Sequence, residues 1–229
     1  MKKLNSPPLR LPRHRPLLYL ITDRQTLRRH PAKPGAPGDW GAQLEAISQA
    51  AAAGCQLIQI RERDLSARAL AELTRAACAV VRQHGARVLV NDRVDVALAA
   101  EADGVHLRAS SVCASDARAI AQRCGREDFL IGASVHTIGE AEEAERAADF
   151  VVCGPVYQTP SKQAYGPPLG IESFAAIARA IAIPTLALGG IKMENFHLPL
   201  SSGAAGIAAI GLFTEPTTIE ERVRTILKS

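Results

Sequence analysis

The segment at residues 154–162, GPVYQTPSK, has the composition of a loop that binds an anion. Small residues let backbone N–H groups approach a phosphate, Thr159 and Ser161 add hydroxyl donors, and Lys162 brings a positive charge. The same residue types are also typical of a surface turn in which prolines only set backbone dihedrals. A later apolar run ends in Gly189-Gly190, which suits the same kind of ligand. We therefore predict a phosphate site if the fold brings these two segments together.

Short apolar runs alternate with longer Ala-rich segments of helical periodicity along the whole chain. The expected strands are Leu17–Thr22, Gln56–Arg61, Arg87–Asn91, Gly104–His106, Phe129–Ala133, Phe150–Cys153, Pro184–Ala187 and Ala205–Ala208. The expected helices are 39–53, 66–83, 93–100, 114–123, 138–147, 171–180, 193–200 and 216–228. Four of these helices begin at residues that commonly cap a helix, namely Asp39, Ser66, Ser115 and Thr137.

Strict alternation of strand and helix requires parallel strands joined by right-handed crossovers, and eight such units close a barrel. We therefore predict an α/β fold with a single (β/α)8 TIM barrel over residues 17–229. A doubly wound open sheet is the alternative. It would place a Gly-rich fingerprint after the first strand, and residues 22–30, TDRQTLRRH, contain none.

Composition, charge and cysteine spacing limit which partners and which cellular compartment we expect. Hydrophobic residues make up 47% of the chain and aromatic residues 4%, as expected for buried parallel strands under Ala-rich helices. Much of the net charge of +4 lies in residues 1–16, a basic Pro-rich tail that we expect to be disordered and to bind neither nucleic acid nor membrane. The five cysteines lack C-x-x-C spacing, which favours free thiols. We expect a cytoplasmic protein that binds a small molecule, and a homo-oligomer is compatible with the sequence.

In such a barrel, the C-terminal ends of the strands line the active-site face. Polar residues follow nearly every expected strand, although the strands themselves are almost wholly apolar. The candidates are Thr22, Asp23, Gln59, Arg61, Arg63, Asn91, Asp92, Arg93, His106, Ser134, His136, Thr159, Ser161, Lys162, Gly189, Gly190, Ile210 and Gly211. The last two loops of such barrels commonly hold a phosphate. His106 has two interpretations, as a site residue or as a core histidine, and the sequence leaves both open.

Several motifs resemble the thiamin phosphate synthase and TenI superfamily in order and spacing. They are LYLITDR at 18–24, LIQIRER at 57–63, VNDRVDVAL at 90–98, ADGVHL at 102–107, IGASVHT at 131–137, the GPVYQTPSK loop and ALGGI at 187–191. The resemblance implies a (β/α)8 barrel that binds a thiazole phosphate. In this superfamily the synthase joins that compound to a pyrimidine pyrophosphate with Mg2+. The TenI-type enzyme instead tautomerises a thiazole phosphate carboxylate to its aromatic form.

The resemblance also assigns roles to the candidates. Thiazole phosphate is expected at Gln59, Asn91, Ser134, Thr159, Ser161, Gly189, Gly190, Ile210 and Gly211. Lys162 is expected above the anionic part of the ligand. Arg61 and Arg63 would meet a substrate carboxylate or, in a synthase, the pyrophosphate. His136 corresponds to the proton carrier of the TenI-type enzymes, and imidazole titrates near neutrality as such a step requires.

Two positions depart from the synthase pattern. Arg63 replaces a lysine, which keeps the charge but changes its geometry. The pattern after strand four is close to H-L-G-Q-E-D, whose final carboxylate helps to hold Mg2+, whereas this chain reads HLRASS with Ser111 in that place. Asp92 remains as a metal ligand if the chain is synthase-like, or as an ion-pair partner of Arg61 or Arg93.

Three functions follow from these departures. We rank first a TenI-type thiazole tautomerase that needs no cofactor, with His136, Arg61 and Lys162 as the catalytic residues. The alternative is a Mg2+-dependent thiamin phosphate synthase with an altered pyrophosphate site. A non-catalytic barrel that binds thiazole phosphate is the third.

Overall fold

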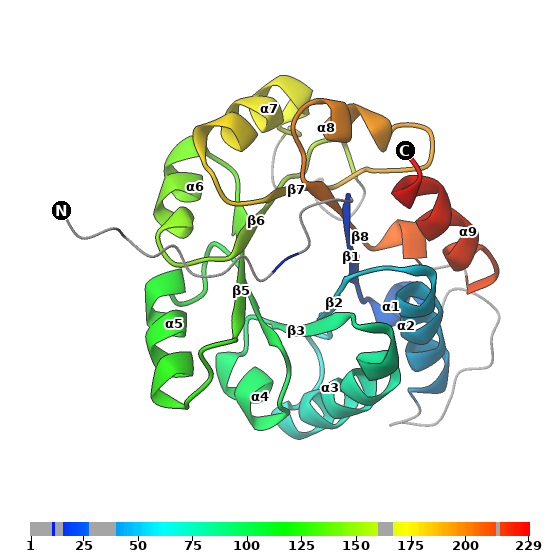
Figure 1. The fold of residues 1–229 in the computed structure, drawn as a ribbon, viewed down its shortest axis with the longest axis vertical. Coiled ribbons are helices and arrows are strands. Elements are labelled where there is room, and N and C mark those ends of the chain that lie inside the picture. Colours follow the sequence, from blue (N-terminus) through cyan, green and yellow to red (C-terminus); the bar gives the residue numbers. More distant parts are fainter. Residues whose placement is uncertain (1–10, 12–15, 28–39, 160–166, 214–215) are drawn as a thin grey trace.

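Eight parallel strands form a closed barrel in the order β1-β2-β3-β4-β5-β6-β7-β8. The computed structural model describes residues 11, 16–27, 40–159, 167–213 and 216–229. The strands are β1 (Leu17–Ile21), β2 (Leu57–Ile60), β3 (Arg87–Asn91), β4 (Gly104–Leu107), β5 (Leu130–Val135), β6 (Phe150–Cys153), β7 (Thr185–Leu188) and β8 (Gly206–Ala209). Figure 1 looks along the barrel and shows the strands as an inner ring inside a ring of helices. The predicted (β/α)8 architecture is confirmed.

Helices follow the strands as the alternation predicts. They are α1 (Arg24–Leu27), α2 (Gly41–Ala53), α3 (Ala67–Val81), η1 (Arg82–His84), α4 (Val94–Ala99), α5 (Ala114–Arg123), α6 (Ile138–Glu145), α7 (Gly170–Ala180), α8 (His197–Ser201), η3 (Gly211–Phe213) and α9 (Pro216–Leu227). The expected helix at 193–200 begins only at His197, because the Asn195 side chain accepts a hydrogen bond from the Lys192 amide and stabilises a turn there.

The predicted helix caps are partly confirmed. Ser66 and Thr137 cap α3 and α6, each accepting a hydrogen bond from the amide three residues on. Ser115 was a wrong assignment, since α5 already begins at Ala114 and Cys113 is its N-cap. Asp39 lies outside the described residues.

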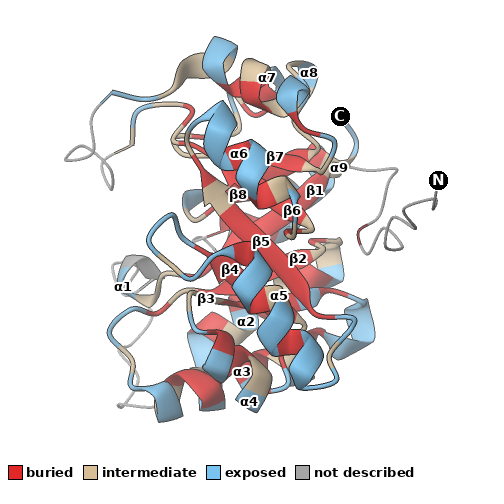
Figure 2. Ribbon diagram, turned by 90° about the vertical axis from the view of Figure 1, so that its left-hand side faces the viewer, coloured by how far each residue is buried: buried red, intermediate tan, exposed pale blue. Residues whose placement is uncertain are grey.

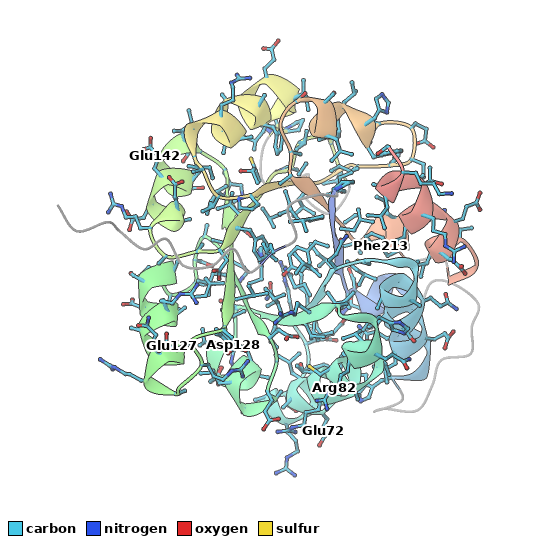
Figure 3. All side chains as sticks on the ribbon, in the orientation of Figure 1. Glu72, Arg82, Glu127, Asp128, Glu142 and Phe213 are labelled. Carbon is cyan, nitrogen blue, oxygen red and sulfur yellow. The ribbon has the colours of Figure 1, made fainter. Side chains whose placement is uncertain are left out.

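Alternation along the strands separates two hydrophobic cores. One set of side chains fills the barrel interior and includes Tyr19, Leu57, Leu89, Phe150 and Leu186. The other set points outward and packs under the helices. Figure 2 shows buried strands and helices that are buried on their inner faces and exposed outside. Figure 3 shows side chains filling the ring, while Glu72 and Glu142 lie on the outer helices. The interior is therefore packed, and ligands must bind at one end of the barrel.

Leu11 is a described residue of the basic N-terminal stretch that precedes β1. Its side chain is only 5% exposed and belongs to the interior cluster with Leu17 and Tyr19. Residues 1–10 and 12–15 lie outside the described residues, so the expected disorder of the tail stays a prediction.

Candidate active site

The two-residue period of the strands directs four predicted residues into the barrel. Inward-facing Leu57 is followed on the same face by Gln59 and then Arg61, and inward-facing Leu89 is followed by Asn91. Ser134 lies on the face of β5 that also carries inward-facing Leu130. Polar side chains of β2, β3 and β5 therefore converge above the apolar interior, at the C-terminal ends of the strands.

An aromatic and polar layer forms the floor of this mouth. The Tyr19 ring lies 5.5 Å from the Phe150 ring and 5.6 Å from the His106 ring, measured between centroids. Gln59 donates a hydrogen bond of 3.0 Å to the Tyr19 hydroxyl. His106 Nε2 lies 2.9 Å from Ser134 Oγ. Gln59 and Ser134 are thus held by the floor.

His106 is a neutral, buried member of that floor. Burial, and secondarily the positive charge of Arg61, lowers the pKa of the His106 imidazole from 6.5 to about 3. Its Nδ1 atom is buried without a hydrogen-bond partner among the described residues. Gly132 must lack a side chain because a Cβ there would lie 2.8 Å from this nitrogen. The geometry favours a positioning role for His106 beneath Ser134 over proton transfer.

Arg61 provides a partly buried positive charge at the mouth. Its backbone amide donates a hydrogen bond of 2.9 Å to Thr22 Oγ1, which fixes the start of the loop after β2. Burial, followed by the charge of Arg63, lowers the pKa of the Arg61 guanidinium, with Arg108 acting in the same direction. Among the described residues, no carboxylate lies within ion-pair distance of this guanidinium. A half-buried guanidinium without a carboxylate partner in the described chain attracts an anionic ligand.

Glu62 lies between Arg61 and Arg63 in sequence, and its carboxylate forms an ion pair of 3.5 Å with Arg24. Its carboxylate is buried and accepts hydrogen bonds from the Arg24 amide and the Gln43 side chain. Burial raises the pKa of Glu62, and the hydrogen bond from Thr22 opposes that shift. Glu62 therefore anchors α1 and α2 to the end of β2.

Asp92 directly follows β3 and is held in an unusual conformation. Its φ of 69° lies in the left-handed region, which is uncommon for a residue other than glycine. Its amide donates a hydrogen bond of 2.8 Å to the His106 carbonyl. Its carboxylate accepts a short hydrogen bond from the Ser111 hydroxyl and pairs at 2.6 Å with the Arg108 guanidinium. Backbone strain of this kind commonly marks functional sites.

The partner predicted for Asp92 was wrong. Neither Arg61 nor Arg93 pairs with it, because Arg93 instead forms a 2.6 Å ion pair with Asp95 two residues on. Arg108 lies in the HLRASS segment after β4, and the sequence interpretation did not pair it with Asp92. Arg108 is the site residue that the sequence interpretation missed.

His136 lies immediately beyond β5, and its side chain is 38% exposed. Its Nδ1 atom lies 3.2 Å from the Glu140 carboxylate, which also accepts a 2.6 Å hydrogen bond from the His136 amide. Glu140 thereby fixes the ring at the start of α6. The arrangement is that of an imidazole oriented by a carboxylate, with Nε2 as the second ring nitrogen.

The opposite side of the mouth is built from backbone. Gly189 and Gly190 follow β7 with φ of 100° and 66°, and a Cβ on Gly189 would lie 2.6 Å from the Pro155 backbone. The Tyr157 amide donates 3.0 Å to the Gly189 carbonyl, so the loops after β6 and β7 contact each other. Successive amides in such left-handed turns suit an anion. The two segments that the sequence paired are thus adjacent.

The remaining predicted residues divide into two groups. Thr159 is half-buried at the end of the described part of the loop after β6, and Ile210 and Gly211 follow β8 at the start of η3. Ser161 and Lys162 lie outside the described residues, so their roles stay predictions.

A groove opens beside the mouth between α5 and α6. It is lined on one side by the loop after β4, including Arg108, Ser111 and Val112, and on the other by Glu140 and Glu143 of α6. Ser134 at the end of β5 also lines it. Arg108 of the Asp92–Arg108 pair therefore borders this groove.

Two properties of the described chain complete the description. Its five cysteines are free, as predicted. Among the described residues, no helix combines the length and apolar character needed to cross a membrane.

Comparison with known proteins agrees with this geometry. The thiamine monophosphate synthase family model matches residues 18–213. A protein of Geobacter sulfurreducens named putative thiamine-phosphate synthase is 47% identical over 212 residues, which cover 92% of each chain. Thiamine-phosphate synthase of Roseiflexus sp. is 37% identical over 92% of this chain and 83% of its own length.

A solved structure gives the same result. Thiamine phosphate pyrophosphorylase from Pyrococcus furiosus superposes with a TM-score of 0.77 and 32% identity, over 93% of this chain and 95% of its own. The chain belongs to the thiamine monophosphate synthase family.

Proposed function

We propose that the protein is a thiamin-phosphate synthase, which joins a pyrimidine pyrophosphate to thiazole phosphate and releases pyrophosphate. The names of its relatives favour this function over the tautomerase that we ranked first on sequence. Two phosphorylated substrates require two anion sites at one mouth. The guanidiniums after β2 and the glycine turn after β7 offer these two sites.

The observation that carries the proposal is the half-buried Arg61 without a carboxylate partner in the described chain. When the bond between the pyrimidine unit and the pyrophosphate breaks, negative charge develops on the departing group. Arg61, with Arg63 beside it, is placed to neutralise that charge, and a desolvated guanidinium does so more strongly than an exposed one. Thr159, Gly189 and Gly190 then bind the phosphate of the thiazole.

The family resemblance implies Mg2+, and the described residues do not fit it well. Asp92 is the carboxylate expected to bind the ion, but one oxygen accepts from Ser111 and the other pairs with Arg108. No cluster of three or more Asp, Glu, His or Cys side chains in the described part of the chain could hold a metal. The proposed roles at the pyrophosphate therefore rest on the cationic side chains.

A direct assay tests the synthase. Purified protein is incubated with hydroxymethylpyrimidine pyrophosphate and thiazole phosphate, and thiamin phosphate and pyrophosphate are measured by chromatography. We expect the two products in equal amounts, with Arg61→Gln losing most of the activity and Arg126→Gln, on the far end of the barrel, retaining it. Absence of thiamin phosphate from the wild-type reaction, both in EDTA and with Mg2+ added, would refute the proposal.

The tautomerase stays as a second candidate because of the His136–Glu140 pair and the engaged Asp92 carboxylate. The same protein is offered the thiazole phosphate carboxylate tautomer, and its aromatisation is followed by absorbance. The tautomerase predicts that His136→Asn loses turnover but keeps ligand binding, whereas His84→Asn, on exposed η1, changes neither. Binding without either reaction would identify the non-catalytic binder.

A further inference from the structure

The loop after β4 is folded around the Asp92 carboxylate. The Arg108 amide donates a hydrogen bond of 2.8 Å to Ser111 Oγ, and the Ser111 amide donates one of 3.0 Å to the Arg108 carbonyl. The Ser111 hydroxyl donates a hydrogen bond to one carboxylate oxygen, and the Arg108 guanidinium binds the other at 2.6 Å. Both oxygens of Asp92 are thus engaged by residues of one short, internally bonded turn.

This arrangement opposes a divalent cation at Asp92. A hard cation needs oxygen lone pairs and usually one or two free carboxylates. Here the hydroxyl of Ser111 already donates to Asp92, and the charge of Arg108 would repel the ion at close range. Among the described side chains, no further acid completes a cluster with Asp92.

The same arrangement keeps positive charge where an anion would bind. A guanidinium has five N–H donors, and Asp92 accepts from one nitrogen of Arg108. Arg108 is close enough to lower the pKa of Arg61, so the two cations act on a common region with Arg63. Its side chain is 42% exposed and borders the groove between α5 and α6, so a ligand can reach it.

We propose that the Arg108 guanidinium, held by Asp92, takes the place of the divalent cation, so that this mouth binds a diphosphate group without a metal ion. The proposal rests on the pyrophosphate site of the proposed function and adds its cation. Asp92 acts as a positioning residue for Arg108, and its strained backbone fixes the direction of the pair.

Binding of inorganic pyrophosphate tests the proposal without turnover. Isothermal titration of the full chain is carried out in EDTA and again in excess Mg2+. We expect the two dissociation constants to agree within about threefold, and Arg108→Ala to weaken binding in EDTA by about tenfold or more. The matched control is Arg87→Ala at the N-terminal end of β3, which removes an arginine that pairs with Asp103 and should leave the affinity unchanged.

A metal probe gives an independent measurement. Mn2+ binding to the protein alone is followed by electron paramagnetic resonance. The wild type should show no stoichiometric site, whereas the double variant Arg108→Gly with Ser111→Asp should gain one that is lost again with Asp92→Asn. Circular dichroism verifies that each variant is folded. Arg108→Lys keeps the positive charge and should retain part of the affinity for pyrophosphate.

Three results would overturn the proposal: pyrophosphate binding that weakens tenfold or more in EDTA, no pyrophosphate binding in either buffer, or a wild-type Mn2+ site that Asp92→Asn removes. These outcomes are separate from the fate of the proposed function. Metal-free pyrophosphate binding without thiamin phosphate formation would refute the synthase and leave the Arg108 site intact. Turnover and binding that both require Mg2+ would refute only the Arg108 site.

Discussion

The two sides of the barrel mouth use different materials to attract an anion. The side after β6 and β7 is built from backbone, with Gly189 and Gly190 packed directly on Pro155 and Tyr157. The side after β2 and β4 is built from charged side chains, with Arg61 partly desolvated and Arg108 paired to Asp92. The glycine side is therefore fixed by steric fit and contributes to folding. The arginine side costs stability and contributes to binding.

Gly189→Ala should have the largest effect, because it combines an unfavourable φ of 100° with a Cβ 2.6 Å from the Pro155 backbone. We expect a loss of about 2–4 kcal/mol in the free energy of unfolding, together with loss of thiazole phosphate binding. Urea unfolding measures the first and calorimetry the second. Gly139→Ala is the control, since a Cβ there meets nothing within 4 Å. A Gly189→Ala variant as stable as this control would remove the steric basis of the comparison.

Arg61→Gln should separate binding from stability on the other side. Burial and the charge of Arg63 disfavour the charged guanidinium in the folded state. The variant should therefore bind pyrophosphate about 100-fold more weakly, while its free energy of unfolding stays equal or rises by about 0.5–1 kcal/mol. Calorimetry and urea unfolding measure both quantities. A variant that loses stability as well would show that Arg61 has a structural role, and the contrast between the two sides would fail.

His106 lies in the floor beneath Ser134 and should give the smallest effect, a dependence of stability on pH. Its folded-state pKa of about 3 lies below the ordinary 6.5, so between these values the unfolded chain binds a proton that the folded protein does not. Stability from this group is present above pH 6.5 and decreases as the pH falls, by at most about 1.4 kcal/mol per unit. Nuclear magnetic resonance should find a neutral His106 ring at pH 5. A His106 that titrates near 6.5 would contradict the buried floor.

The sequence predicted the inward set of the site because period two is a local property of a strand. Once β2 and β3 are placed, the inward positions of Gln59, Arg61 and Asn91 follow from alternation with Leu57 and Leu89. The glycine turn after β7 could also be predicted from the sequence, since a Gly-Gly pair at a strand end indicates positive φ. The roles of Ser161 and Lys162 stay predictions, because these residues lie outside the described chain.

The sequence interpretation also ranked the tautomerase above the synthase, the reaction that the names of the relatives favour. Ser111 in place of a carboxylate was taken as evidence against a synthase, whereas chains named thiamine-phosphate synthase match this one over nearly its whole length. A single substitution shows which group is absent. It does not show which neighbouring group replaces it.

The sequence by itself determined the alternation of elements, the inward faces of the strands and the two loops that suit a phosphate, because each depends on residues near one another in the chain. Only the tertiary structure decided that Arg108 pairs with Asp92, that Tyr19 supports Gln59 and that His106 supports Ser134. These pairs are 16, 40 and 28 residues apart. The register between neighbouring strands selects them among several chemically equivalent partners, and that register is set by closure of the whole barrel.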